Sequence, residues 1–188
     1  MGWLDEGIES GWVRAAVAVA EVLGQEPVDR LVSSPLARAL QTAAPLAARL
    51  SCRPVIDQRF GELRVGQWEG YTEDEIAERW PEHWQRWRSE PHTLKMDGRE
   101  TLADLNARVA GALDELFADL VDGRVAVVFT HDAVVRGAVA WALGTGPEIY
   151  RHVEVANCSI TTVGMVAGVR RLARANEKAH LGGLALEG

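Results

Sequence analysis

Arg38 lies in a segment whose residues are suited to binding a phosphate or carboxylate group. Residues 33–43 read SSPLARALQTA, and Ser34-Pro35 is a strong start signal for a helix that would run to about Leu50. The N–H groups at a helix N-terminus attract anions, and a guanidinium one turn inside adds a bidentate contact. An exposed helical arginine is the alternative that composition alone would favour.

His131 is the second candidate, because it follows an apolar strand. The strand expected over 124–129 is continuously apolar from Val125 to Phe129, which is typical of a parallel-sheet strand buried on both faces. Ligands bind to such sheets at the carboxyl ends of the strands, where His131 would lie. The alternative is a histidine held by backbone hydrogen bonds, and the sequence does not choose between the two.

A glycine-rich loop supplies the third candidate. Residues 61–70 read GELRVGQWEG, and Glu62 and Glu69 lie near Trp68 in this loop. A carboxyl group held beside an aromatic ring can have a raised pKa and act as a general acid. The loop alone does not rank one glutamate above the other. A surface loop anchored by one tryptophan is the alternative. Glycoside cleavage by the two carboxylates is a weaker one, because it gives the Arg38 segment no purpose.

Local signals predict the elements that must position these groups. Helices are expected over 10–24, 34–50, 72–88, 100–120 and 133–143, and strands over 28–33, 54–56, 124–129, 159–166 and 169–173. Ser10 is a candidate N-cap of the first helix. Thr72 and Glu75 form a capping box, and Pro81 breaks or kinks the helix that they begin. Strands separated by helices imply a three-layer α/β/α sandwich with a mostly parallel sheet.

Length and composition narrow the class of protein. The chain has 188 residues, of which 47% are hydrophobic and 25% charged, with a net charge of −7. These values are typical of a globular protein, and we expect one domain over 1–188 with a loose tail over 182–188. The negative charge speaks against binding of nucleic acid or an anionic membrane, and no apolar run approaches the roughly 18 residues that span a bilayer. Since no signal peptide is recognisable, the sequence predicts a cytoplasmic protein.

The cysteines and the other histidines carry weaker signals. Cys52 and Cys158 are the only cysteines, and without a secretory signal they are expected to be buried free thiols. No Cys/His spacing suggests zinc, so we expect no metal and no cofactor. The remaining histidines are expected to be structural or solvated: His83, His92, His152 and His180.

In their order and spacing, the candidate segments resemble the histidine phosphatase superfamily, the phosphoglycerate mutase-like proteins. Residues 33–43 match the family's Ser-Ser-Pro-Leu-x-Arg-Ala-x-x-Thr-Ala segment, 62–70 look like its acid loop, and 130–136 are close to its second-histidine motif. Residues 98–102 are similar to its Gly-Glu-Ser/Thr helix start, with Arg99 as an extra residue. Further likeness to the family's closing segments is found at 156–159 and 175–181. The resemblance implies the phosphoglycerate mutase-like fold.

The resemblance also implies roles for the candidate residues. Arg38 and His131 would bind the phosphoryl group. Glu62 would protonate the leaving oxygen and then activate water, and Glu69 would shape the loop. Such chemistry depends on positioning and charge stabilisation, which cationic side chains can supply without a metal. The implied partner is a phosphorylated small molecule, with no nucleic acid and no membrane, and a homodimer is compatible with the sequence.

One element of the family is absent. The sequence contains no Arg-His-Gly, the motif whose histidine is the family's nucleophile. Residues 2–5 resemble the loop after that motif, so we expect about 20 upstream residues, including the first strand, to be missing. In the family that strand lies between the strand ending at His131 and the strand after Asn157. Without that strand, three outcomes are open. The two neighbouring strands pair directly, another chain or an upstream segment donates a strand, or the true start of the protein lies upstream of Met1. The last is preferred, because Arg38 and Glu62 are intact.

The sequence therefore predicts a phosphomonoester hydrolase that uses a phosphohistidine in its complete form and is inactive as written. A non-catalytic phosphate-ligand binding or scaffold protein is the first alternative. Phosphoglycerate mutase is the second alternative. It is disfavoured because the segment over 70–98 is short, whereas mutases of the family carry longer insertions at this place. Four tryptophans in or next to this stretch either cover the leaving group or pack among themselves: Trp68, Trp80, Trp84 and Trp87.

Overall fold

A three-stranded parallel sheet forms the centre of the molecule. The computed structural model describes residues 2–3, 7–9, 11–182 and 184. Strand β1 (Val28–Ser33) lies between β2 (Val55–Ile56) and β3 (Val125–Phe129), and all three strands run in the same direction. Ser33 pairs with Phe129 at the carboxyl end. The residues that follow β1 and β3 therefore emerge side by side at one edge of the sheet.

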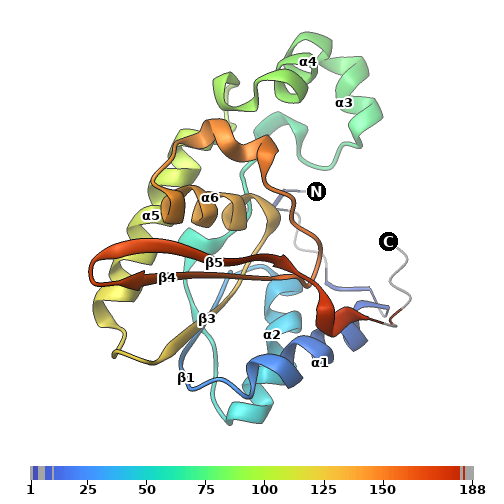
Figure 1. The fold of residues 1–188 in the computed structure, drawn as a ribbon. Coiled ribbons are helices and arrows are strands. Elements are labelled where there is room, and N and C mark those ends of the chain that lie inside the picture. Colours follow the sequence, from blue (N-terminus) through green and yellow to red (C-terminus); the bar gives the residue numbers. More distant parts are fainter. Residues whose placement is uncertain (1, 4–6, 10, 183, 185–188) are drawn as a thin grey trace.

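Helices cover both faces of this sheet (Figure 1). On one face, α1 (Trp12–Leu23) packs against α2 (Ala37–Leu50). On the other, α5 (Leu102–Asp119) packs against α6 (Asp132–Leu143). This arrangement confirms the predicted three-layer α/β/α architecture.

The side chains of β3 show why its sequence is continuously apolar. Val127 and Phe129 belong to the core beneath α1 and α2, whereas Val128 packs against the core beneath α5 and α6. Neighbouring residues of a strand point to opposite faces, so a strand covered on both sides needs apolar residues at every position.

An antiparallel hairpin forms a second sheet. Strand β4 (Ile160–Val166) pairs with β5 (Val169–Glu177), which extends four residues beyond the predicted end at Ala173. In the described part of the chain, β3 pairs with β1 only and β4 with β5 only. Direct pairing of β3 with β4, one of the three outcomes considered for the sheet, is therefore not what this structure adopts.

Two short helices project beyond the sheet (Figure 1). The predicted capping box of Thr72 and Glu75 starts α3 (Glu73–Arg79), and α4 begins at Pro81 and ends at Ser89. Trp68 is 3% exposed, and its ring makes edge-to-face contacts with Trp84 and Trp87 at 6.1 and 6.3 Å. The tryptophans were expected either to cover the leaving group or to pack among themselves. Trp68, Trp84 and Trp87 pack among themselves.

Short 3-10 helices connect the main elements. They are η1 (Gln58–Phe60), η2 (Gly66–Trp68), η3 (Pro91–Thr93), η4 (Pro147–His152) and η5 (Ala179–Leu181). No helix in the described residues is both long and apolar enough to cross a membrane.

The structure corrects the predicted start of α2. The helix begins at Ala37 with Leu36 at the N-cap position, so Ser34 does not cap it and Pro35 is not its first residue. The Ser34 hydroxyl accepts a hydrogen bond from the Leu36 N–H at 3.2 Å, ahead of the helix, and it also contacts His131 across the sheet edge. The helix also continues through Pro45 to the predicted end at Leu50.

Two other predictions concern residues at the margins of the fold. Cys52 and Cys158 are free thiols as expected, but Cys52 is exposed and Cys158 only partly buried, so the prediction that both are buried is wrong. The proposed cap Ser10 and most of the predicted tail, 183 and 185–188, lie outside the described residues.

Candidate phosphate-binding site

The sheet edge brings His131 against Ser34. The Ser34 backbone N–H donates to the Phe129 carbonyl at 2.9 Å, which extends the pairing of β1 and β3 by one residue. Nε2 of His131 then lies 2.7 Å from Oγ of Ser34. His131 is the N-cap residue of α6 and is 8% exposed. A side-chain hydroxyl thus contacts its ring, rather than the backbone group that the alternative interpretation assumed.

The surroundings of His131 favour an uncharged imidazole. Burial lowers its pKa to about 3, with the positive charges of Arg38 and Arg108 acting in the same direction. The neutral ring has one N–H donor and one acceptor nitrogen at physiological pH. An incoming dianion would raise the pKa again, because an opposite charge favours the protonated form.

Arg38 is the second residue of α2, in its first turn. Its Nη2 donates to the Gly2 carbonyl oxygen at 2.7 Å. Its charge lowers the pKa of both His131 and Glu62, so the guanidinium lies within electrostatic reach of both groups. The structure therefore brings the three predicted site residues together at the carboxyl end of the sheet.

The carboxyl group of Glu62 has a pKa near neutrality, so both of its protonation states are populated at neutral pH. Burial raises its pKa to about 7, although the Leu63 N–H donates to its Oε1 at 2.7 Å and opposes the shift. The negative charge of Asp132 raises the pKa further, while Arg38 and the Ala133 N–H at the start of α6 lower it. A carboxyl with a pKa near neutrality can both give and take a proton, as general acid–base catalysis requires.

The second loop carboxylate, Glu69, lies in different surroundings. A Cβ built at Gly2 would meet Oε2 of Glu69 at 2.6 Å, so the two residues are in close approach. Glu69 lines a surface hollow with Trp3, Arg64, Gly66 and Gly98. The structure thus distinguishes two glutamates that the loop sequence could not rank.

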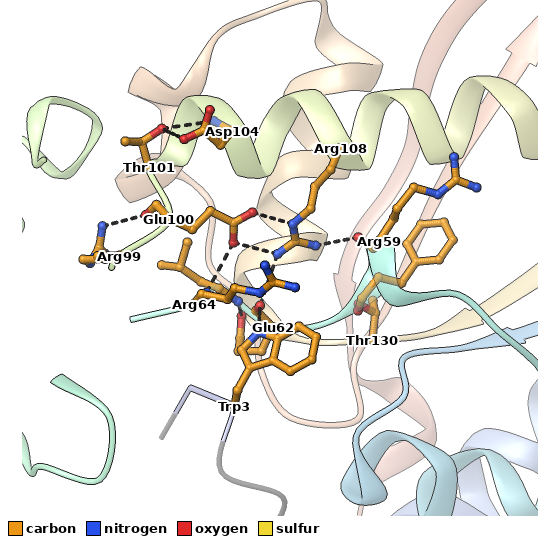
Figure 2. Close-up of polar contacts among 12 residues, drawn as sticks. Trp3, Arg59, Glu62, Arg64, Arg99, Glu100, Thr101, Asp104, Arg108 and Thr130 are labelled. Atoms are coloured by element: carbon orange, nitrogen blue, oxygen red, sulfur yellow. Dashed lines mark hydrogen bonds and ion pairs between the residues drawn. The ribbon is translucent and has the colours of Figure 1, made fainter. Parts of the chain in front are cut away.

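Arg108 holds the loop that carries Glu62, and no sequence motif had pointed to it (Figure 2). Its Nε and Nη2 donate to the two carboxylate oxygens of Glu100 at 2.5 and 2.9 Å. The remaining donors reach backbone carbonyls on either side of the loop, with Nη1 on Arg59 at 2.5 Å and Nη2 on Glu62 at 3.1 Å. One side chain of α5 therefore fixes the backbone of the candidate acid.

Two further contacts fix the loop from other elements. Oγ1 of Thr130, which follows β3, donates to the Phe60 carbonyl at 2.7 Å. The indole N–H of Trp3 donates to the Glu62 carbonyl at 2.5 Å. A Cβ at Gly61 would lie 2.5 Å from the Trp3 ring, so only glycine fits there without displacing that ring.

Tyr150, on η4, extends the site beyond Glu62. Burial raises the pKa of its hydroxyl, and the negative charges of Asp132 and Glu62 raise it further. Its ring lies between Trp87, at 5.4 Å between centroids, and the Arg136 guanidinium, at 4.8 Å. Sequence reasoning missed Tyr150, because its position depends on a loop far from Glu62 in the chain.

Two further predictions concerned the remaining histidines and metal binding. His180 contacts the Cys158 carbonyl through Nε2 at 2.9 Å. Among the residues with described positions, no group of three or more His, Cys, Asp and Glu side chains is arranged to hold a metal ion.

Fold and site together define an α/β protein with an arginine, a histidine and a carboxyl of raised pKa at the carboxyl end of a parallel sheet. The chain belongs to the histidine phosphatase superfamily (branch 1), whose model matches residues 2–178. This membership confirms the resemblance inferred from the sequence motifs.

Individual relatives agree with this assignment. The chain is 29% identical to phosphoserine phosphatase 1 of Hydrogenobacter thermophilus over 181 residues, which cover 96% of this chain and 85% of that protein. A mycobacterial glucosyl-3-phosphoglycerate phosphatase, solved with inorganic phosphate, is 29% identical with a TM-score of 0.87, over 96% of this chain and 92% of that one. Bacillus stearothermophilus YhfR shares the fold, with a TM-score of 0.90 at 22% identity over 96% and 90% of the two chains.

Proposed function

We propose that the edge of the sheet binds phosphomonoesters, with the phosphoryl group on Arg38 and His131 and the ester oxygen facing Glu62. The observation that carries the proposal is the convergence of these three groups, with the Glu62 pKa at about 7 and the Arg38 charge acting on both other residues. The relatives named phosphoserine phosphatase and glucosyl-3-phosphoglycerate phosphatase support a phosphorylated small molecule as the ligand.

Each of the three residues makes a different contribution to binding the ligand. Arg38 supplies a fixed positive charge and planar donors that match phosphate oxygens. His131 supplies one N–H donor in its neutral form. Glu62 in its protonated form can hydrogen-bond the ester oxygen and give it a proton as the P–O bond breaks.

Turnover requires a nucleophile that the sequence does not supply in the family's form. Family resemblance assigns that role to the histidine of Arg-His-Gly, a motif absent from the 188 residues. We therefore propose that this chain alone binds phosphomonoesters without hydrolysing them, and that it is the binding and acid–base part of a phosphatase site. The same absence favours a non-catalytic phosphate-binding protein as the second candidate function. The short stretch over 70–98 speaks against a mutase.

One ligand with two readouts tests the proposal. Calorimetry with p-nitrophenyl phosphate should show binding by the wild-type chain, and absorbance should show no release of p-nitrophenol above buffer. Arg38→Met should weaken binding roughly ten- to hundredfold, the range expected for loss of charge-assisted hydrogen bonds. Arg49→Met is the matched control, because Arg49 lies exposed at the other end of the same helix.

The outcomes separate the parts of the proposal. Equal binding by the wild type and Arg38→Met, or no binding by either, contradicts the phosphate site. Release of p-nitrophenol that depends on Arg38 supports the site but contradicts the absence of turnover.

A further inference from the structure

Arg99 is a buried guanidinium with an unused hydrogen-bonding edge. The residue is 7% exposed and lies in the loop before α5 (Figure 2). Its Nη1 donates to the Glu100 carbonyl at 3.1 Å. Nε and Nη2 are both buried and have no hydrogen-bond partner among the residues that the structure describes. Buried donors of a charged group are rarely left in this state, because their desolvation is costly.

The two unused atoms point to one kind of ligand. Nε and Nη2 lie on the same edge of a guanidinium, and their N–H bonds are nearly parallel. This edge matches the two oxygens of a carboxylate in a bidentate pair. Burial lowers the pKa of Arg99 to about 10, so the group still carries its charge at neutral pH.

The residues around Arg99 occupy its faces rather than this edge. The guanidinium lies over the rings of Trp87, at 4.4 Å, and Trp68, at 5.3 Å. These cation–π contacts stabilise the charge but accept no hydrogen bond. The nearby Glu100 carboxylate is already paired with Arg108. Arg99 thus has aromatic surroundings without a carboxylate partner from the described chain.

The backbone at Arg99 is held in a fixed position. A Cβ at Gly66 would lie 2.6 to 2.8 Å from backbone atoms of Gly98 and Arg99, so the two loops cross at a distance that only glycine allows. The Arg99 N–H also donates to the Met96 carbonyl at 3.1 Å. A rigid backbone beneath a guanidinium favours selective recognition, because little conformational freedom is lost on binding.

Tyr150 connects Arg99 with the candidate phosphate site. The charges of Arg99, Glu62 and Asp132 all act on the Tyr150 hydroxyl, so the three groups lie within electrostatic reach of one side chain. Trp87, which covers a face of Arg99, also contacts the Tyr150 ring. Arg99 is therefore connected through Trp87 to a side chain that also lies within electrostatic reach of Glu62.

We propose that Arg99 is a specificity-determining residue that binds a carboxylate on the leaving group, so that the preferred ligands are phosphomonoesters of small hydroxy acids. This inference rests on the proposed phosphate site. Because Nε and Nη2 are buried, a carboxylate can reach them only after a shift of the groups that cover this edge. Trp87 is suited to such a shift, since it lies on α4, a helix with no buried residue.

A matched pair of ligands tests the proposal. 3-Phosphoglycerate and glycerol 3-phosphate differ only in a carboxylate that is replaced by a hydroxymethyl group. We expect calorimetry on the wild-type chain to show a preference of about tenfold or more for 3-phosphoglycerate. Arg99→Met should abolish this preference and leave glycerol 3-phosphate affinity unchanged. Arg99→Lys, which keeps the charge but loses the planar edge, should retain part of the preference.

Arg170→Met is the control, because Arg170 also lies over a tryptophan, Trp141, but is paired with Asp114. It should keep the full preference. A wild-type chain that binds both ligands equally overturns the carboxylate proposal while leaving the phosphate site supported. Loss of affinity for both ligands in Arg99→Met assigns Arg99 a structural role and also overturns the proposal. A wild-type chain that binds neither ligand contradicts the phosphate site, and the carboxylate proposal with it.

Discussion

Arg108, which is partly buried on α5, and Arg99, which is buried in the loop before α5, differ in how their donors are used. Arg108 directs its donors to the Glu100 carboxylate and to the carbonyls of Arg59 and Glu62. Arg99, in the tryptophan-rich region, makes one hydrogen bond and leaves its Nε–Nη2 edge without a partner in the described chain. The same type of side chain therefore fixes the backbone in one region and is left with an unpartnered edge in the other.

The difference shows that burial alone does not identify the role of a charged group. A buried arginine with a complete set of partners contributes to stability through them, and removing it leaves those partners unsatisfied. A buried arginine without partners costs desolvation energy in the free protein and regains it only when a ligand binds. The same substitution should therefore have opposite consequences at the two positions.

The largest effect is expected for Arg108→Met. The side chains of Arg108 and Glu100 are 20% and 11% exposed, and breaking such a pair leaves a largely buried carboxylate unpaired. We expect a loss of about 3–5 kcal/mol in the free energy of unfolding, measured by urea denaturation with tryptophan fluorescence. The double variant with Glu100→Gln should recover part of the loss. A change below about 1 kcal/mol would show that the pair does not hold the loop.

A much smaller effect on folding is expected for Arg99→Met. Methionine can fill the space between Trp68 and Trp87 without an unpaired charge, so the free energy of unfolding should stay within about 1 kcal/mol of the wild type or rise. The same urea titration at neutral pH provides the measurement. A loss as large as that of Arg108→Met would mean that Arg99 stabilises the free protein and would remove the contrast between the two arginines.

Most helices and strands could be predicted from the sequence, because each carried its own local signal. The strand over 28–33 matches β1, and the capping box at Thr72 marks the start of α3. The start of α2 was mispredicted: the Ser34 hydroxyl does accept from the Leu36 N–H, but the helix begins only at Ala37, and the same hydroxyl contacts His131. A local pattern cannot show a contact with a residue so distant in the sequence.

For the candidate site, sequence reasoning found the residues that follow strands or lie in the acid loop. Arg38 and His131 could be placed together because parallel strands end at the same edge of a sheet. Arg108 and Tyr150 could not be found, because their contacts with the Glu62 loop exist only after the helices have packed. Arg99 was visible as an additional residue in a family segment, but its unused edge appears only in three dimensions. The roles of Arg38, Glu62 and His131 stay predictions.

The central claim, that Glu62 shares one anion site with Arg38 and His131, can be tested with sulfate, whose charge does not change between pH 6 and 9. A bound dianion disfavours the charged carboxylate and so raises the Glu62 pKa above its free value of about 7. Binding therefore takes up a proton above pH 7, and sulfate affinity should fall as pH rises, by roughly tenfold or more between pH 6 and 9. Glu62→Gln should remove this dependence and keep the higher affinity across the range. A wild-type affinity that does not vary with pH, or an equal decline in Glu62→Gln, would contradict the claim.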